Sequence, residues 1–171
     1  MPESRKEEGL VMGLSVAHNG ALASLRKRQR LGFVVRGAER AAISRTVKAL
    51  SVVTPSFSQE VERLSGGNQQ KVVIAKWLIC EPRLIIFDEP TRGVDVGSKV
   101  EIWRLMRNLA NDGAAILMIS SELPEIIGMS NRVLVMHKGR IAGELSGDRV
   151  NEEAILTLAS FGEKHEQHGD S

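Results

Sequence analysis

Residues Leu64 to Asp95, LSGGNQQKVVIAKWLICEPRLIIFDEPTRGVD, decide the fold. Ser65 is a suitable N-cap for a helix, and Pro82 forces that helix to end before it. Four apolar residues follow at Leu84 to Phe87 without polar alternation, which predicts a strand buried on both faces. The stretch therefore predicts a helix, a short connection and a buried strand that ends in two carboxylates.

Further regular elements are expected on both sides of this stretch. Residue patterns predict helices at 21–30, 37–50, 96–111 and 151–159, and strands at 114–119, 133–136 and 140–142, the last two joined by a turn at Lys138-Gly139. Residues 10–17 fit a strand or a loose helix start, 52–61 fit a loop, and Ser121 is suited to cap a short helix. Helices and strands alternate from residue 65 onward, which is typical of an α/β fold with a mostly parallel sheet.

The composition argues against several classes of protein. The formal net charge of +2 is too small to indicate nucleic acid or an anionic membrane as a partner, and the absence of Tyr argues against stacking of nucleobases. No apolar stretch approaches the roughly 18 residues that a membrane span needs, and residues 1–6 lack the apolar core of a secretion signal. Cys80, the one cysteine, lies in an apolar run and indicates a buried thiol in a reducing compartment. We therefore expect a cytoplasmic domain.

The first candidate site is Ser65-Gly66-Gly67 at the expected helix start. A helix N-terminus carries unpaired N–H groups and a partial positive charge, so it attracts phosphate, and glycine lets a ligand approach the backbone closely. Taken alone, the triplet more often marks only an N-cap with a flexible entry. Asn68, Gln69 and Gln70 are unusual at a helix start and either contact a nucleotide or form an exposed first turn.

The second candidate site is the pair Asp88-Glu89 at the end of the expected strand. Ligands of open α/β sheets bind at the carboxyl ends of the strands, where Asp88 would hold Mg²⁺ through a water and Glu89 would polarise the water that attacks a phosphate. Alone, Asp-Glu-Pro is equally a turn that caps the next element. Asp95 is placed to cap the helix that begins at Val96. No Gly-x-x-x-x-Gly-Lys-Ser/Thr phosphate loop occurs in the 171 residues.

The joint pattern resembles the motifs of ATP-binding cassette (ABC) ATPases. Leu64 to Gln70 resembles their signature motif, Leu84 to Glu89 their Walker B strand, and Gly93 to Asp95 their D-loop. A narrower similarity, to the second cassette of bacterial monosaccharide importer ATPases of the ribose, xylose, arabinose and galactose type, is carried by residues 2–6, 66–71, 75–78, 91–97 and 120–125. The resemblance covers about residues 2 to 160 and implies a partial P-loop NTPase fold. Its domains would be a helical signature subdomain at 1–62, beginning at the Q-loop, the C-terminal part of the ATPase core at 63–161, and a disordered tail at 162–171.

The resemblance also implies roles for the matching residues. Ser65, Gly66 and Gly67 would contact the γ-phosphate of an ATP held by an opposite cassette, and Asp95 would act across the interface between the cassettes. Asp88 would serve Mg²⁺, and Glu89 would be the catalytic carboxylate. Two positions depart from the general family pattern, since Glu3 stands where the Q-loop glutamine would be and Ser121 where the switch histidine would be.

The implied protein is an ATP-hydrolysing subunit of a sugar importer, at the inner face of the plasma membrane. Its partners would be a second cassette and a membrane-spanning sugar permease, which residues 10–60 would touch. Because the chain begins at the Q-loop, it resembles a cassette cut in two, and we expect it to leave a sheet edge or apolar face exposed and to bind ATP poorly alone. Alternatives are a module that donates its signature motif in trans, an inactive remnant, or a cassette ATPase outside transport.

Overall fold

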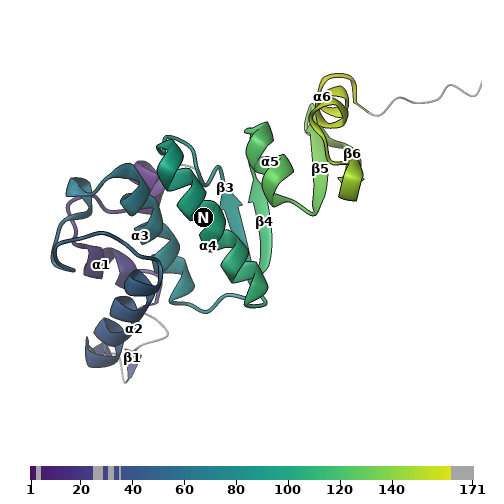
Figure 1. Cartoon of the computed structure of the whole chain (residues 1–171). Helices are drawn as coiled ribbons and strands as arrows, with labels where there is room; N and C mark the ends of the chain where they lie inside the picture. The colour runs from purple at the N-terminus through teal and green to yellow at the C-terminus, as the bar shows by residue number, and fades with distance from the viewer. Residues whose placement is uncertain (3–4, 25–28, 31–32, 35, 163–171) are drawn as a thin grey trace, which may run out of the picture. The chain divides into compact units, whose positions relative to one another are not determined.

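The computed structural model describes residues 1–2, 5–24, 29–30, 33–34 and 36–162 (Figure 1). These residues divide into two compact units, Met1–Ile119 and Ser120–Ser171, and each is described by itself. The predicted boundary between the helical subdomain at 1–62 and the ATPase core at 63–161 was drawn from the motifs and not from compactness. It stays a prediction. Glu3 and most of the predicted tail at 162–171 lie outside the described residues.

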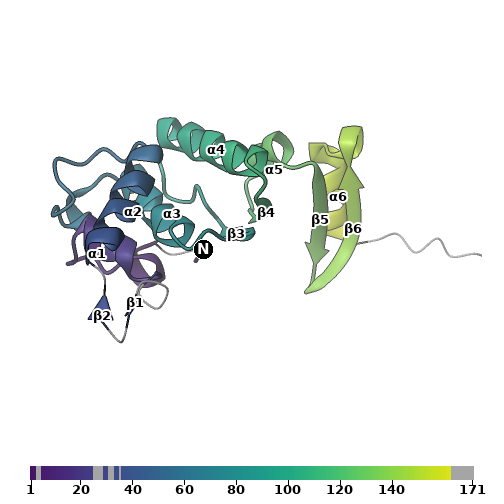
Figure 2. The ribbon, with the colours of Figure 1, turned by 90° about the horizontal axis from the view of Figure 1, so that it is seen from below.

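Helices form the first part of unit 1. A single π-helical turn η1 (Arg5–Gly9) precedes α1 (Val16–Ala21), α2 (Arg36–Ala49) and α3 (Gly66–Leu78), and the three α-helices pack against one another (Figure 2). Their buried side chains include Val16, Ile43 and Val47. Gly20 allows α1 to approach α2 closely. A Cβ at this position would lie only 3.3 Å from a methyl carbon of Ile43. The predicted helices at 37–50 and from Ser65 are confirmed.

The predicted helix at 21–30 is wrong. Residues 22–24 form a turn, and the backbone at β1 (Gln29–Arg30) pairs antiparallel with β2 (Phe33–Val34). A short helix depends on burying an apolar face, and the basic run Arg26 to Arg30 offers none. The alternatives at 10–17 resolve into a turn followed by α1, which Ser15 caps by accepting a hydrogen bond from the backbone N–H of His18.

A strand–helix–strand segment completes unit 1. β3 (Leu84–Asp88) and β4 (Ala115–Ile119) are parallel, with Leu84 opposite Ala115 and Asp88 opposite Ile119, and α4 (Val96–Asn111) connects them. The alternation of helices and strands predicted a mostly parallel sheet, and this pair is parallel. The other strand pairs of the described residues are antiparallel.

One face of the β3–β4 pair is uncovered. Ile85 and Phe87 are 5% and 0% exposed, but Leu84 and Ile86 on the opposite face are 54% and 44% exposed. The prediction of a strand buried on both faces is therefore wrong, because no described element of unit 1 covers the second face. The expected exposed apolar face is confirmed.

Unit 2 is a hairpin with two helices. α5 (Leu123–Met129) precedes β5 (Arg132–His137) and β6 (Arg140–Ser146), and η4 (Gly147–Arg149) leads into α6 (Glu152–Phe161). Lys138 and Gly139 both have positive φ, as the tight turn of a right-twisted hairpin requires. α6 packs on the hairpin, and the core consists of Val133, Val135, Leu145 and Ile155. The predicted hairpin and last helix are confirmed, with Asn151 as the cap of α6.

Ser121 does not cap α5, contrary to the prediction. Glu122 occupies the N-cap position and makes no capping hydrogen bond with its side chain. The hydroxyl of Ser120 instead accepts from the Glu122 N–H at 3.1 Å and donates to a carboxylate oxygen of Glu125 at 2.6 Å. In the part of the chain that the structure describes, no helix is long and apolar enough to cross a membrane.

Candidate functional site

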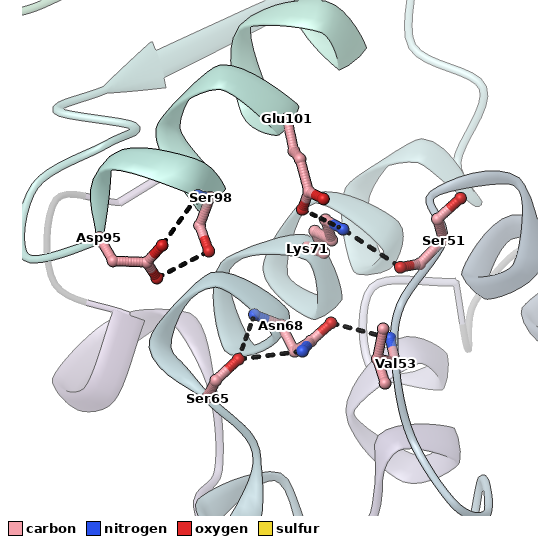
Figure 3. A network of polar contacts seen from close by, with 8 residues as sticks. All are labelled: Ser51, Val53, Ser65, Asn68, Lys71, Asp95, Ser98 and Glu101. Atoms are coloured by element: carbon pink, nitrogen blue, oxygen red, sulfur yellow. Dashed lines mark hydrogen bonds and ion pairs between the residues drawn. The ribbon is translucent and has the colours of Figure 1, made fainter.

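Ser65 organises the first turn of α3. It is the N-cap, and its exposed Oγ accepts hydrogen bonds from the backbone N–H of Asn68 at 3.4 Å and from the side-chain Nδ2 of Asn68 at 2.9 Å (Figure 3). A hydroxyl that accepts twice still has its own O–H to donate. The start of α3 thus combines an exposed hydroxyl with the partial positive charge of a helix N-terminus, which suits an anionic ligand.

Asp95 organises the first turn of α4 in the same way. Its two carboxylate oxygens accept from Ser98, from the backbone N–H at 3.0 Å and from the hydroxyl at 2.8 Å. These hydrogen bonds to the charged form lower the pKa of the exposed Asp95 carboxyl. Asp95 is therefore the helix cap that the sequence predicted, and it stays ionised at neutral pH.

The two helix starts lie side by side. Figure 3 shows the first turn of α4 beside that of α3, and a Cβ on Gly67 would come within 2.2 Å of the Ser98 Oγ. A side chain at Gly67 is thus excluded by the neighbouring helix. The structure thereby brings Ser65, Gly66, Gly67 and Asp95 together, from segments that the sequence separates by an entire helix and strand.

A second set of contacts fixes α3 to its surroundings. The side-chain Oδ1 of Asn68 accepts from the backbone N–H of Val53 at 2.8 Å. Lys71, only 6% exposed, donates to the Ser51 carbonyl at 3.1 Å and pairs with the Glu101 carboxylate at 2.8 Å (Figure 3). The loop after α2, the signature-like helix and α4 are therefore joined by polar contacts.

Gln69 is not part of an exposed first turn. It is 5% exposed, and its Nε2 donates to the carbonyls of Val61 at 3.1 Å and Leu64 at 3.2 Å. Its Oε1 accepts from the Arg5 guanidinium at 3.2 Å. The described contacts of Gln69 lie within the fold, and its predicted contact with a nucleotide stays a prediction.

Asp88 and Glu89 lie at the carboxyl end of β3, as expected. Asp88 is half-buried at the end of the strand, and Glu89 has φ +45°. The Glu89 N–H donates to the Ile119 carbonyl at 2.9 Å, and the Glu89 carbonyl accepts from the Arg92 N–H at 3.1 Å. A glutamate whose backbone is in the left-handed conformation is strained, and it persists only where the surrounding structure holds it. Such strained residues are common at functional sites.

Two predicted site residues lie outside the described part of unit 1. Ser121 is exposed and lies in unit 2, where it lines a shallow hollow with Leu123, Pro124 and Glu152. Glu3 lies outside the described residues. In unit 1 the cluster therefore comprises Ser65 to Gln69 and Asp95. The two carboxylates stand separately, at the end of β3.

Sequence reasoning missed three residues that shape this cluster. Arg5, Lys71 and Ser98 form its main side-chain contacts. Arg5 and Lys71 lie in stretches that carry the family resemblance, but the sequence assigned a role to none of the three. The sequence held a weak indication for Lys71. It lies four residues before Ala75, on the apolar face of α3, and a lysine that is buried there needs a partner. Arg5 and Ser98 carried no such signal, because the contacts of Arg5 with Gln69 and Gly93 and that of Ser98 with Gly67 join segments that are remote in sequence.

The fold defines the class of protein. A dimeric ATP-binding cassette, MJ0796, in a post-hydrolysis state bound to ADP and Pi, matches with a TM-score of 0.70 over 82% of this chain and 60% of its own, at 23% sequence identity. A second structure of MJ0796, described as a bacterial ABC transporter cassette, matches with a TM-score of 0.69. The chain has the α/β fold of ATP-binding cassettes, in part.

The sequence comparisons define the family. The ABC transporter profile matches residues 4–92, slightly more than half of the 171 residues, and the chain belongs to the ABC transporter family. It is 51% identical over 160 residues to "Ribose import ATP-binding protein RbsA 2" of Streptomyces avermitilis and 50% identical over 160 residues to "Ribose import ATP-binding protein RbsA" of Bacillus licheniformis. Each alignment covers 94% of this chain and 32% of the relative, so the chain spans about a third of these relatives' length.

Proposed function

We propose that the chain is the C-terminal part of the second cassette of a sugar-importer ATPase, and that it takes part in ATP hydrolysis coupled to carbohydrate uptake. The single observation that carries the proposal is the contact of Gly67 with Ser98, which sets the signature-like helix start beside the turn that ends at Asp95. Relatives that are half identical and named for ribose import support the substrate class.

The roles of individual residues follow from this placement. Ser65, Gly66 and Gly67 would receive the γ-phosphate of an ATP held by a second cassette, using the helix start and the Ser65 hydroxyl. Asp95 would act beside them across the same interface. Asn68 and Gln69 would hold the helix start in place and border the nucleotide, and Glu3 and Ser121 would occupy the Q-loop and switch positions.

Asp88 and Glu89 would serve the ATP of their own cassette. Mg²⁺ usually keeps several waters and takes one or two carboxylates besides the phosphates, so Asp88 fits, although the described residues hold no cluster of three or more metal-binding side chains. When bound, the ion would neutralise charge on the phosphates. Glu89 would orient the attacking water and hold its proton. The phosphate loop comes from residues outside these 171.

The partners follow from the same proposal. A second cassette would face the start of α3, and a sugar permease would contact the helical part at 10–60. The chain would then work at the inner face of the plasma membrane. No nucleic acid is expected, because the net charge is only +2.

Reconstitution tests the proposal. The purified chain is mixed with a polypeptide that carries the preceding, phosphate-loop half of a ribose-import cassette, and ATP hydrolysis is measured. We expect activity in the mixture only, and about a 10²-fold or larger loss with Glu89→Gln. The control is Glu62→Gln, which changes an exposed glutamate on η3 (Val61–Arg63). Equal rates for the Glu89→Gln and control mixtures would contradict the proposal.

A second candidate is a module that donates its signature motif in trans. The exposed Ser65 hydroxyl at the start of α3 favours it. The same assay distinguishes the two, because a donor module raises the ATPase rate of a complete cassette without the complementary half, and Ser65→Arg abolishes that increase.

A further inference from the structure

The Arg5 guanidinium joins three separate groups of unit 1. Its Nε donates to the Gln69 side-chain Oε1 at 3.2 Å, its Nη1 to the Arg92 carbonyl at 3.1 Å, and its Nη2 to the Gly93 carbonyl at 3.1 Å. One planar side chain thus connects α3 with the turn between β3 and α4. A guanidinium can do so because its donors point in several fixed directions.

Each end of this connection is itself fixed. Gln69 is buried and donates to two carbonyls of the segment that leads into α3. η1, which begins at Arg5, is tied to α3 at its other end by Lys76, whose ammonium donates to the Gly9 carbonyl at 2.5 Å. Burial lowers the pKa of Lys76, as expected for an ammonium removed from water. Arg5 therefore projects from a backbone that α3 holds.

The turn that receives Arg5 runs from Glu89 to Asp95, and its Arg92 and Gly93 are exposed. It bends at Gly93, with φ +65°, and its internal backbone bonds include Val94 N–H to the Thr91 carbonyl at 3.2 Å. The guanidinium also lies against the bare Cα of Gly66, since a Cβ there would lie 3.0 Å from Nη2. Arg5 thus packs between the helix start and the turn as well as bonding to both.

We propose that Arg5 is a positioning residue of the composite ATP site. It holds the Arg92–Gly93 turn against the first turn of α3, so that Ser65 and Asp95 face a second cassette in one fixed arrangement. The inference rests on the proposed function for its consequence in ATP hydrolysis, but the positioning itself is a property of this chain.

Hydrogen exchange of the full 171-residue chain tests the positioning without nucleotide. We expect Arg5→Ala to speed exchange of the Arg92 and Val94 amides about tenfold, with interior α2 amides unchanged, because the loss is local. Arg5→Lys should behave like Arg5→Ala, since one ammonium cannot reach three acceptors. The control is Arg63→Ala. Arg63 is exposed, and its described ion pair is with the neighbouring Glu60, at 3.3 Å. Unchanged exchange in Arg5→Ala, equal acceleration everywhere, or full protection in Arg5→Lys would overturn the proposal.

The reconstituted ATPase supplies the second readout. We expect Arg5→Ala to lower kcat about fivefold or more with KM for ATP within about twofold, because the residue aligns the site and does not touch nucleotide. A rise in KM at unchanged kcat would overturn the positioning role. If the unsubstituted mixture does not hydrolyse ATP, the proposed function fails, while the exchange result still decides the role of Arg5.

Discussion

Gly67 allows the first turns of α3 and α4 to pack closely against each other. Its bare Cα faces Ser98, and the space for a Cβ is already filled by the serine Oγ and Cβ, at 2.2 and 2.5 Å. The sequence predicted Gly67 as a place where a ligand approaches the backbone. The structure gives it a second reason to be glycine, which is the contact between α3 and α4.

Gly67→Ala is therefore expected to lower the free energy of unfolding by about 2 kcal/mol, because packed helices must move apart. Ser98→Gly, which removes both clashing atoms, should recover part of the loss in the double variant. Urea unfolding of the single and double variants checks this. Gly128→Ala is the control, since a Cβ there has nothing within 4 Å. Additive losses in the double variant would show that Ser98 is not what excludes the side chain.

At the scale of elements, the sequence predicted the helix starts correctly where a capping residue marks them. The caps Ser65, Asp95 and Asn151 start helices where predicted, because a cap depends on hydrogen bonds within a few residues. The helix expected at 21–30 and the cap at Ser121 failed, since neither had an apolar face or a capping bond to support it.

The site was predictable only in part, for the same reason. The motif residues were identified from order and spacing, but their assembly depends on contacts between remote segments. Arg5 lies 64 residues from Gln69 and 88 from Gly93, and no local pattern encodes such a partner. Burial of β3 was overestimated because it depends on a covering layer, which apolarity alone does not supply.

The ion pair between Lys71 on α3 and Glu101 on α4 makes a prediction at this scale. Lys71 is 7% exposed at its side chain and Glu101 is 55% exposed, so losing the carboxylate leaves a buried ammonium poorly compensated. We expect Glu101→Gln to lower the free energy of unfolding by about 1–2 kcal/mol, less than for a fully buried pair. Urea unfolding measures the change.

The matched control for this pair lies in unit 2. Arg132 and Glu144 form an ion pair at 3.6 Å whose side chains are 66% and 51% exposed. Glu144→Gln should cost about 0.5 kcal/mol or less, because water screens exposed charges. Equal losses of unfolding free energy for Glu101→Gln and Glu144→Gln would mean that burial of Lys71 does not raise the cost of removing its partner.

For the whole molecule, the uncovered face of β3 and β4 is the most consequential feature. Leu84, Ile86, Leu117 and Ile119 share it and are 44–54% exposed, and Asp88 ends the same row. Soluble proteins rarely leave such a contiguous apolar surface without a partner. Under the proposed function, the phosphate-loop half of a cassette would cover this face and complete the environment of Asp88.

Leu117→Lys tests this occupant directly. A lysine in the middle of the face should weaken binding of the phosphate-loop half about tenfold or more, because burying the ammonium against apolar side chains is costly. Titration of the labelled half with each variant measures the affinity, and Val11→Lys, an equally exposed valine in the helical part, is the control. The same Leu117→Lys chain should bind less of a hydrophobic dye when alone, since the patch is interrupted. Unchanged affinity for the half, with reduced dye binding, would show that the face is exposed but is not where the cassette is completed.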